Sequence, residues 1–168
     1  VFSMKTKDNL QSAFAGESQA NRKYLAFADK AAKEGFNKVS RLFKVVAEAE
    51  TIHAHKHLQI MGGVKSTLEN LNSAVEGENY EYTEMYPQFI AEAEQEGNNA
   101  ARASFHLANE AEKAHGALFK KAHQAIEGNQ DLDTESFHLC PVCGYVAENH
   151  APDKCPICGA PGSNFKEY

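Results

Sequence analysis

The sequence of 168 residues has no apolar run that approaches the roughly 18–20 residues required to cross a bilayer, and it has no cluster of basic residues. The first absence excludes a transmembrane helix. Because the formal net charge is -6, the second argues against nucleic acid as a partner. The start of the chain, Val1-Phe2-Ser3-Met4, lacks the charged-then-apolar layout of a secretion signal, and Met4 is a candidate natural start. We therefore expect a cytoplasmic protein with no membrane partner.

Cysteine and proline are nearly absent from most of the chain. All four cysteines lie after residue 139, and before that point Pro87 is the single proline. The first part is instead rich in Ala, Glu, Lys, Gln and Leu, which favour helices. We predict a helical domain over residues 1–127, a polar linker over 128–136, and a small turn-rich module over 137–168.

Glycines divide the helical part into four segments of about 25–30 residues, a length that suits a four-helix bundle. The predicted segment ends lie at Gly35, at Gly62-Gly63, at Gly97 and at Gly128. The stretch Ser66-Thr67-Leu68-Glu69 has the form of a capping box and predicts the start of the third helix.

The helical part contains one helical hairpin twice. Residues 8–17 recur 61 positions later as residues 69–78, and a pattern from Tyr24 to His53 recurs 62 positions later. The change of offset places one extra residue between Glu78 and Tyr86. This predicts either a π-bulge, a feature often found at functional sites, or an ordinary helix that is slightly rotated. The proline at position 87 fits a local irregularity there.

Each copy of the hairpin has a Glu-x-x-His motif and a matched glutamate on the preceding helix. These residues are Glu17, Glu50 and His53 in the first copy, and Glu78, Glu112 and His115 in the second. At a rise of about 1.5 Å per residue, Glu17 and Glu50 lie within one helical turn of the same height below Gly35. Ferritin-like dinuclear sites use this arrangement, and inward carboxylates require cations to neutralise them. Oxygen-rich ligands with two imidazoles suit iron or manganese.

Glu81 has no charged counterpart in the first copy. As a fifth carboxylate, one turn beyond Glu78, it is a candidate mobile ligand that binds in one redox state and leaves in another; an ordinary solvated glutamate is the alternative. Tyr24 and Tyr86 are repeat mates near the metal level. Hydrogen bonds to ligand carboxylates would make them catalytic candidates, and core packing explains them equally well.

Two CxxC motifs, separated by eleven residues, lie in the C-terminal module: Cys140, Cys143, Cys155 and Cys158. This spacing predicts a tetrahedral four-thiolate metal site. The competing interpretation, disulfide bonding, is disfavoured because a CxxC pair is too cramped for an ordinary structural bridge. Four thiolates accept either zinc, which would make the module a structural ribbon, or iron, which would make it a one-electron relay.

In their order along the chain, these motifs resemble the rubrerythrin family from Leu10 to Tyr168. The resemblance rests on Ala15-Gly16-Glu17-Ser18, Glu50-x-x-His53, Gly77-Glu78-Asn79-Tyr80-Glu81, Met85-Tyr86-Pro87, Glu112-x-x-His115, and the knuckles CPVCGY and CPICGA. It implies an all-α, ferritin-like four-helix bundle followed by a small rubredoxin-like module of strands and loops.

The resemblance also implies the metals and their ligands. The ligands of an oxo- or hydroxo-bridged pair of iron ions would be Glu17, Glu50, His53, Glu78, Glu81, Glu112 and His115. On reduction, one iron would exchange Glu81 for His53, so these two residues join Tyr24 and Tyr86 as catalytic candidates. The four cysteines would hold a third iron, with zinc as a possible substitute.

The implied activity is the reduction of hydrogen peroxide to water, as part of oxidative-stress defence. Electrons would pass from a separate NADH-linked reductase or a rubredoxin, through the four-cysteine iron, to the diiron site. Family members are homodimers, in which the cysteine module of one subunit approaches the diiron site of the other. The alternatives are a ferroxidase or iron-handling protein, and a non-catalytic zinc ribbon on a helical scaffold. The thiolate module argues against iron storage, because storage needs no electron relay.

Overall fold

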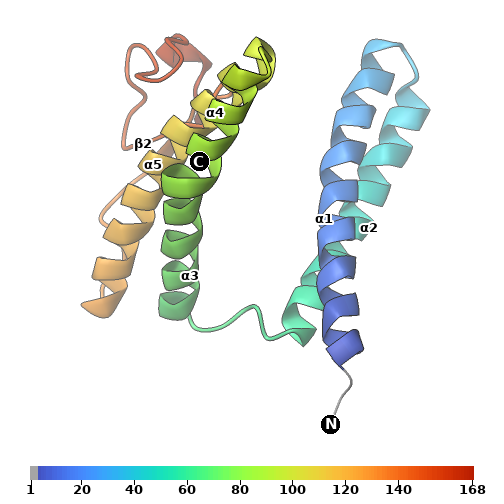
Figure 1. The fold of residues 1–168 in the computed structure, drawn as a ribbon, viewed down its shortest axis with the longest axis horizontal. Coiled ribbons are helices and arrows are strands. Elements are labelled where there is room, and N and C mark those ends of the chain that lie inside the picture. The colour runs from blue at the N-terminus through green and yellow to red at the C-terminus, as the bar shows by residue number, and fades with distance from the viewer. Residues whose placement is uncertain (1–3) are drawn as a thin grey trace. The chain divides into compact units, whose positions relative to one another are not determined.

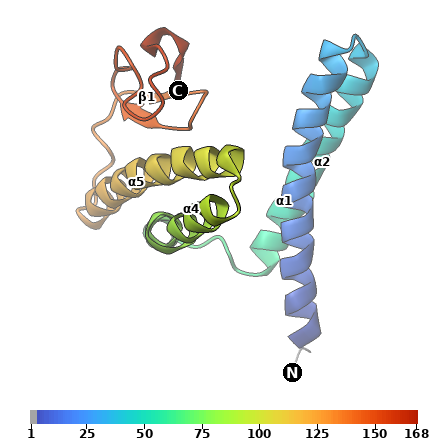
Figure 2. The same ribbon diagram turned by 45° about the horizontal axis from the view of Figure 1, so that its top comes forward.

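A computed structural model describes residues 4–168. The expectation that residues 1–3 form no secretion signal lies outside this range. The described chain divides into two compact units, one ending at Lys65 and the other running from Ser66 to Tyr168. The first unit is a hairpin of α1 (Met4–Lys33) and α2 (Asn37–Ile60), which lie side by side in both views (Figures 1 and 2). None of the helices within residues 4–168 has an apolar stretch long enough to cross a membrane.

Small side chains fill the seam between α1 and α2. Ala28, Ala31 and Ala47 are buried there, and such short side chains let the two helix backbones approach closely. The buried side-chain amide of Asn21 also links α1 to α2. Its Nδ2 atom donates to the carbonyl oxygen of Ala47 and to Oγ1 of Thr51, each at 2.8 Å. The seam is therefore held by close backbone packing and by one polar bridge that fixes the register of the two helices.

The two hairpins turn in the same way. Gly35 and Gly97 both have positive φ angles, of 85° and 70°, which glycine adopts without steric cost. In the first turn the amide of Phe36 donates to the carbonyl of Ala31 at 2.9 Å; in the second, the amide of Asn98 donates to the carbonyl of Ala93 at 2.8 Å. These are the bonds of a Schellman ending, and they confirm both predicted helix ends.

The second unit begins with the predicted capping box. The Ser66 side chain accepts from the Glu69 amide at 3.3 Å, and the Glu69 carboxylate accepts from the Ser66 amide at 3.2 Å. From this cap, α3 runs over Thr67–Tyr80, and a π-helical turn, η1, follows over Glu81–Met85. The internal repeat predicts one extra residue in this region, either as a π-bulge or in a slightly rotated ordinary helix. The structure decides for the π-bulge, since the Tyr86 amide donates five residues back, to the Glu81 carbonyl.

Helices α4 (Tyr86–Gln95) and α5 (Asn99–Glu127) complete the second hairpin. Matched clusters of three rings confirm the internal repeat. Tyr24, Phe27 and Phe43 pack together in the first hairpin with ring centroids 5.6–6.3 Å apart. Their repeat mates, Tyr86, Phe89 and Phe105, pack in the second with centroids 5.5–6.4 Å apart.

The C-terminal module is a small antiparallel sheet with long loops. Its strands are β1 (Phe137–Leu139), β2 (Val146–Glu148) and β3 (Lys166–Glu167), in the order β2-β1-β3, and a short 3₁₀ turn, η2 (Gly162–Asn164), precedes β3. The predicted fold class is confirmed: the described chain is mostly helical, and a small strand-and-loop region with four cysteines follows the helices. The predicted domain boundaries stay a prediction.

Candidate metal centres

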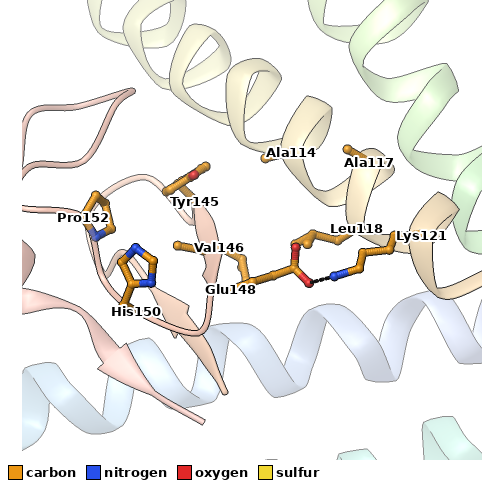
Figure 3. Close-up of a pocket in the computed structure, with 10 residues that line it drawn as sticks. Ala114, Ala117, Leu118, Lys121, Tyr145, Val146, Glu148, His150 and Pro152 are labelled. Carbon is orange, nitrogen blue, oxygen red and sulfur yellow. Dashed lines mark hydrogen bonds and ion pairs between the residues drawn. The ribbon is translucent and has the colours of Figure 1, made fainter. Parts of the chain in front are cut away.

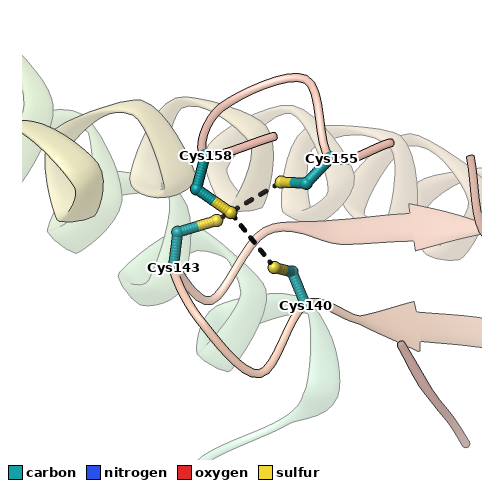
Figure 4. A group of neighbouring side chains, drawn as sticks. All are labelled: Cys140, Cys143, Cys155 and Cys158. Atoms are coloured by element: carbon teal, nitrogen blue, oxygen red, sulfur yellow. Dashed lines mark hydrogen bonds between the residues drawn. The ribbon is translucent and has the colours of Figure 1, made fainter. Parts of the chain in front are cut away.

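The four cysteines converge between two matching loops (Figure 4). Their sulfur atoms all lie within 4.8 Å of one another, with Cys140 and Cys158 at 3.6 Å and Cys143 and Cys155 at 3.5 Å. All four are free thiols in the structure. Four sulfurs bound tetrahedrally at about 2.3 Å would lie about 3.8 Å apart, so the observed spacing suits one metal ion.

The loops hold the sulfurs by backbone hydrogen bonds that repeat between the two CxxC segments. The Gly144 amide donates to the Cys140 carbonyl at 3.0 Å, and the Gly159 amide donates to the Cys155 carbonyl at 2.9 Å. Burial raises the pKa of the Cys155 thiol, but hydrogen bonds from the backbone amides of Cys158 and Ile157 outweigh it and bring the pKa to about 7. The thiolate is the form of cysteine that binds metal. These backbone hydrogen bonds favour the thiolate of Cys155 and so favour its use as a metal ligand.

A second group of metal-binding side chains lies in the second hairpin. Glu78 on α3 and the pair Glu112 and His115 on α5 offer ligand atoms within 4.8 Å of one another. Nδ1 of His115 lies 2.6 Å from Oε2 of Glu112 and 3.9 Å from Oε2 of Glu78. Glu112 and His115 are three positions apart, which is close to one helical turn. Their side chains therefore lie on the same face of α5, as the sequence motif predicts.

The surroundings of the Glu78 carboxylate indicate that this group of residues could hold a cation. Its Oε2 atom is buried and has no hydrogen-bond partner. Burial, together with the neighbouring Glu112 carboxylate, raises the pKa of Glu78 to about 7. A buried oxygen with no donor and a second carboxylate beside it is costly in a protein interior, unless a proton or a metal ion joins them. The donor set therefore fits a hard cation such as iron.

Glu81 and Tyr86 border this group without belonging to it. Burial and the charge of Glu112 raise the pKa of Glu81, so the two carboxylates lie near each other. Burial also raises the pKa of the Tyr86 hydroxyl, and the nearby carboxylates of Glu81, Glu112 and Glu78 raise it further. The structure thus places the extra carboxylate and one of the two candidate tyrosines beside the metal-binding side chains.

The first hairpin has the equivalent group, formed by Glu17, Glu50 and His53. Nδ1 of His53 lies 3.0 Å from Oε2 of Glu50. The two histidines differ in exposure: the side chain of His53 is 56% exposed and that of His115 is 22% exposed. The ring of Tyr24 packs with those of Phe27 and Phe43 in the ring cluster of this hairpin.

His115 also touches the cysteine module of its own chain. Its Nε2 atom donates to the carbonyl oxygen of Gly144, 2.8 Å away, when Nδ1 is the metal-binding nitrogen. Metal-binding histidines commonly donate their second N–H to a backbone carbonyl, which fixes the ring orientation. Gly144 directly follows Cys143, so one hydrogen bond joins the two candidate metal centres of this unit. Among the described residues, His53 has no such partner for its Nε2 atom.

A charged contact holds the module against α5 (Figure 3). Nζ of Lys121 lies 2.7 Å from Oε1 of Glu148 and 3.2 Å from Oδ1 of Asp133. Thr134 joins the same group, since its hydroxyl donates to Oε1 of Glu148 at 2.5 Å. We call these four residues the Lys121 clamp. Sequence reasoning missed both the clamp and Gly144, because no local motif marks contacts between residues so far apart in the chain.

The Rubrerythrin family model matches residues 8–123, and the model of the rubrerythrin rubredoxin-like domain matches residues 138–166. The chain belongs to the rubrerythrin family. The resemblance predicted from the sequence motifs is therefore confirmed.

Relatives match over nearly the whole length of this rubrerythrin-family chain. Rubrerythrin-2 of Clostridium acetobutylicum is 33% identical, over 97% of this chain and 96% of that protein. Nigerythrin of Nitratidesulfovibrio vulgaris is 37% identical, over 97% of this chain and 86% of that protein. A solved structure described as the fully reduced, all-ferrous state of nigerythrin is also 37% identical, with a TM-score of 0.59 over 97% of this chain and 86% of that chain.

Membership in the rubrerythrin family indicates that the cofactor is iron. The rubrerythrin family binds iron, and this chain has both a rubredoxin-like four-cysteine site and carboxylate–histidine groups of the diiron type. Members of the family are oxidoreductases.

Proposed function

We propose that the protein reduces hydrogen peroxide to water at a pair of iron ions, with electrons delivered through the iron of the four-cysteine module. The observation that supports this most directly is the 2.8 Å hydrogen bond between Nε2 of His115 and the Gly144 carbonyl. It joins a candidate diiron ligand to the residue that follows a candidate thiolate ligand. An iron-storage or ferroxidase role gives no reason for this contact.

The proposed iron ligands come from both hairpins. They are Glu17, Glu50, His53, Glu78, Glu81, Glu112 and His115 for the diiron pair, and Cys140, Cys143, Cys155 and Cys158 for the single iron. When bound, the ferrous pair supplies the two electrons that cleave the O–O bond, and the thiolate site exchanges electrons one at a time. The balance is one hydrogen peroxide, two electrons and two protons giving two molecules of water.

The chain's own residues have distinct tasks in this proposal. His115 is the fixed ligand, because its ring is held by Gly144 and is largely shielded from solvent. His53 is free to exchange with Glu81, because its ring lacks an outer hydrogen bond among the described residues. Tyr86 lies beside three carboxylates, where its hydroxyl can donate to one of them and hold a proton near the reacting oxygens. Tyr24 is its repeat mate in the first hairpin.

Substrate choice is the test of this function. The iron-loaded protein, reduced chemically without air, is mixed with stoichiometric hydrogen peroxide or with dioxygen, and reoxidation is followed by visible absorbance. We expect faster reoxidation by peroxide. Faster reaction with dioxygen would contradict the proposal and favour a ferroxidase. A red ferric–thiolate spectrum and elemental analysis test iron against zinc in the cysteine site.

Two further parts of the proposal concern partners. We propose that a separate NADH-linked reductase or a rubredoxin supplies the electrons, and that the protein works as a homodimer in the cytoplasm. Reduction of the thiolate iron by candidate reductases, followed at its visible band, tests the first part. Sedimentation of the iron-loaded protein tests whether it is a homodimer.

A further inference from the structure

A cavity of about 510 Å³ lies between the second hairpin and the cysteine module. Leu71 of α3 and the pair Leu118 and Phe119 of α5 form one side of it. Phe137 of β1 and Val146 of β2 form the other. The walls are therefore mainly apolar, and the volume falls within the range of about 300–1,000 Å³ that is typical of small-molecule sites.

Three lining residues are ionisable, and two of them are already engaged. Glu148 binds Lys121 (Figure 3) and also Thr134, and both residues belong to the Lys121 clamp. His115 binds the Gly144 carbonyl through Nε2. The third is Glu78, whose Oε2 atom is buried without a hydrogen-bond partner. The cavity is thus an apolar chamber whose unsatisfied polar group is a proposed iron ligand.

Hydrogen peroxide does not account for such a chamber. It consists of two hydroxyl groups, has no apolar surface, and gains nothing from leucine, valine and phenylalanine walls. The walls suit a molecule with a compact hydrocarbon body and one polar end that faces Glu78. A substrate that reacts at the proposed iron pair and also fills the chamber must have its peroxide group attached to an apolar substituent.

We propose that this cavity binds organic hydroperoxides, with the alkyl or aryl group between the hairpin and the module and the peroxide group toward Glu78. This inference rests on the proposed function and names a wider substrate class for it. In the reaction the O–O bond breaks, and the hydroperoxide takes up two electrons, which the ferrous pair would supply, and two protons from the solvent. The products are one alcohol and one water.

Cumene hydroperoxide and a cavity-filling variant test the proposal. Chemically reduced, iron-loaded protein is mixed with cumene hydroperoxide or hydrogen peroxide, and the two reoxidation rate constants are compared. Ala122 lines the cavity. We expect Ala122→Phe to lower the ratio of the cumene hydroperoxide rate to the hydrogen peroxide rate by about tenfold, as small changes in apolar pockets do. Ala103→Phe, on an exposed position of the same helix, should leave the ratio unchanged.

Binding of the product alcohol gives a readout independent of turnover. Calorimetric titration of the iron-loaded protein with 2-phenyl-2-propanol should show binding, which Ala122→Phe weakens and Ala103→Phe does not. If Ala122→Phe fails to fold, titrations of Ala122→Leu and of the wild type still show whether the alcohol binds in the cavity. Absence of alcohol binding, or binding that the cavity variants leave unchanged, overturns the proposal.

The outcomes separate this inference from the proposed function. Reoxidation by hydrogen peroxide but not by cumene hydroperoxide overturns the inference and leaves peroxide reduction intact. If neither peroxide reoxidises the protein, the proposed function fails, and the alcohol titration alone decides whether the cavity accepts an apolar ligand.

Discussion

Nε2 of His115 and the carbonyl oxygen of Gly144 lie 2.8 Å apart, although 29 residues separate them in the chain. One partner belongs to the Glu-x-x-His motif of α5, and the other follows a cysteine of the C-terminal module. The route from the Cys143 sulfur to the His115 ring therefore consists of a few covalent bonds and one hydrogen bond. This hydrogen bond is a direct connection between the module and the carboxylate–histidine group of its own chain.

Loss of one thiolate should separate electron supply from peroxide chemistry. We expect Cys158→Ser to leave the reaction of peroxide with the chemically reduced protein intact and to abolish turnover driven by an external reductase, because the four-thiolate site is disrupted. Stopped-flow reoxidation measures the first step, and NADH consumption with a reductase measures the second. Reductase-driven turnover at the wild-type rate would show that the relay role is wrong.

The Lys121 clamp should affect electron delivery without affecting the peroxide step. Lys121→Met keeps an unbranched side chain that is one atom shorter and removes its charge, so the contacts with Glu148 and Asp133 are lost. We expect slower reductase-driven turnover and faster amide hydrogen exchange in residues 133–148. The matched control is Lys113→Met on the same helix, where the lysine pairs with Glu110. Equal behaviour of the two variants would mean that the clamp does not position the module.

The Lys121 clamp should stabilise the folded protein less at acidic pH than at neutral pH. Hydrogen bonds from Lys121 and Thr134 lower the pKa of Glu148 below its ordinary value of 4.5. Because the folded-state pKa is the lower one, this stabilisation is present above pH 4.5 and is lost as the pH falls through the folded-state pKa. We expect the difference in Tm between wild type and Lys121→Met to be constant from neutral pH down to about pH 5 and to shrink at lower pH. A difference that persists unchanged in acid would exclude the carboxylate of Glu148 as its source.

Gly116 lets α3 and the π-helical turn approach the metal-binding face of α5. A Cβ at this position would lie 3.3 Å from Cε1 of Tyr82 and 3.5 Å from Cβ of Glu78. The contact with Tyr82 is the tight one, so Gly116→Ala should displace the Tyr82 ring, and with it the π-helical turn that contains Glu81, and weaken iron binding. The gain in helix propensity, about 1 kcal/mol, offsets the strain in folding stability.

Iron titration and denaturant unfolding test these two effects of Gly116→Ala separately. The control is Gly77→Ala on α3, because a Cβ at Gly77 meets no atom within 4 Å. It should raise the free energy of unfolding with no change in iron affinity. Equal iron affinity in both variants would contradict the positioning role of Gly116.

Glu81 should matter more for turnover than for folding. We expect Glu81→Ala to slow peroxide reduction about tenfold or more, as loss of groups around a metal does, with a small effect on the free energy of unfolding. Glu84→Ala is the matched control, because Glu84 lies in the same π-helical turn and is exposed. Equal rates for Glu81→Ala and wild type would show that Glu81 is a solvated side chain without a role at the metals.

Features that depend on neighbouring residues could be predicted from the sequence. The capping box at Ser66 and Glu69 spans one helical turn, and the glycine endings at Gly35 and Gly97 follow from the local freedom of φ. The Glu-x-x-His motifs place their side chains on one helical face for the same reason. The extra residue before Tyr86 could be located from the repeat, but its form could not, because a π-bulge and a rotated helix have the same length of chain.

The helices, their ends, the internal repeat, the metal-binding residue types and the family follow from the sequence, because each is recorded in short-range spacing or in a motif. Tertiary structure alone decided that the cysteine module docks on α5, that the Gly144 carbonyl meets His115, and that an apolar cavity opens beside Glu78. These depend on residues far apart in the chain that meet only after folding, where the His115–Gly144 hydrogen bond and the Lys121 clamp select one arrangement.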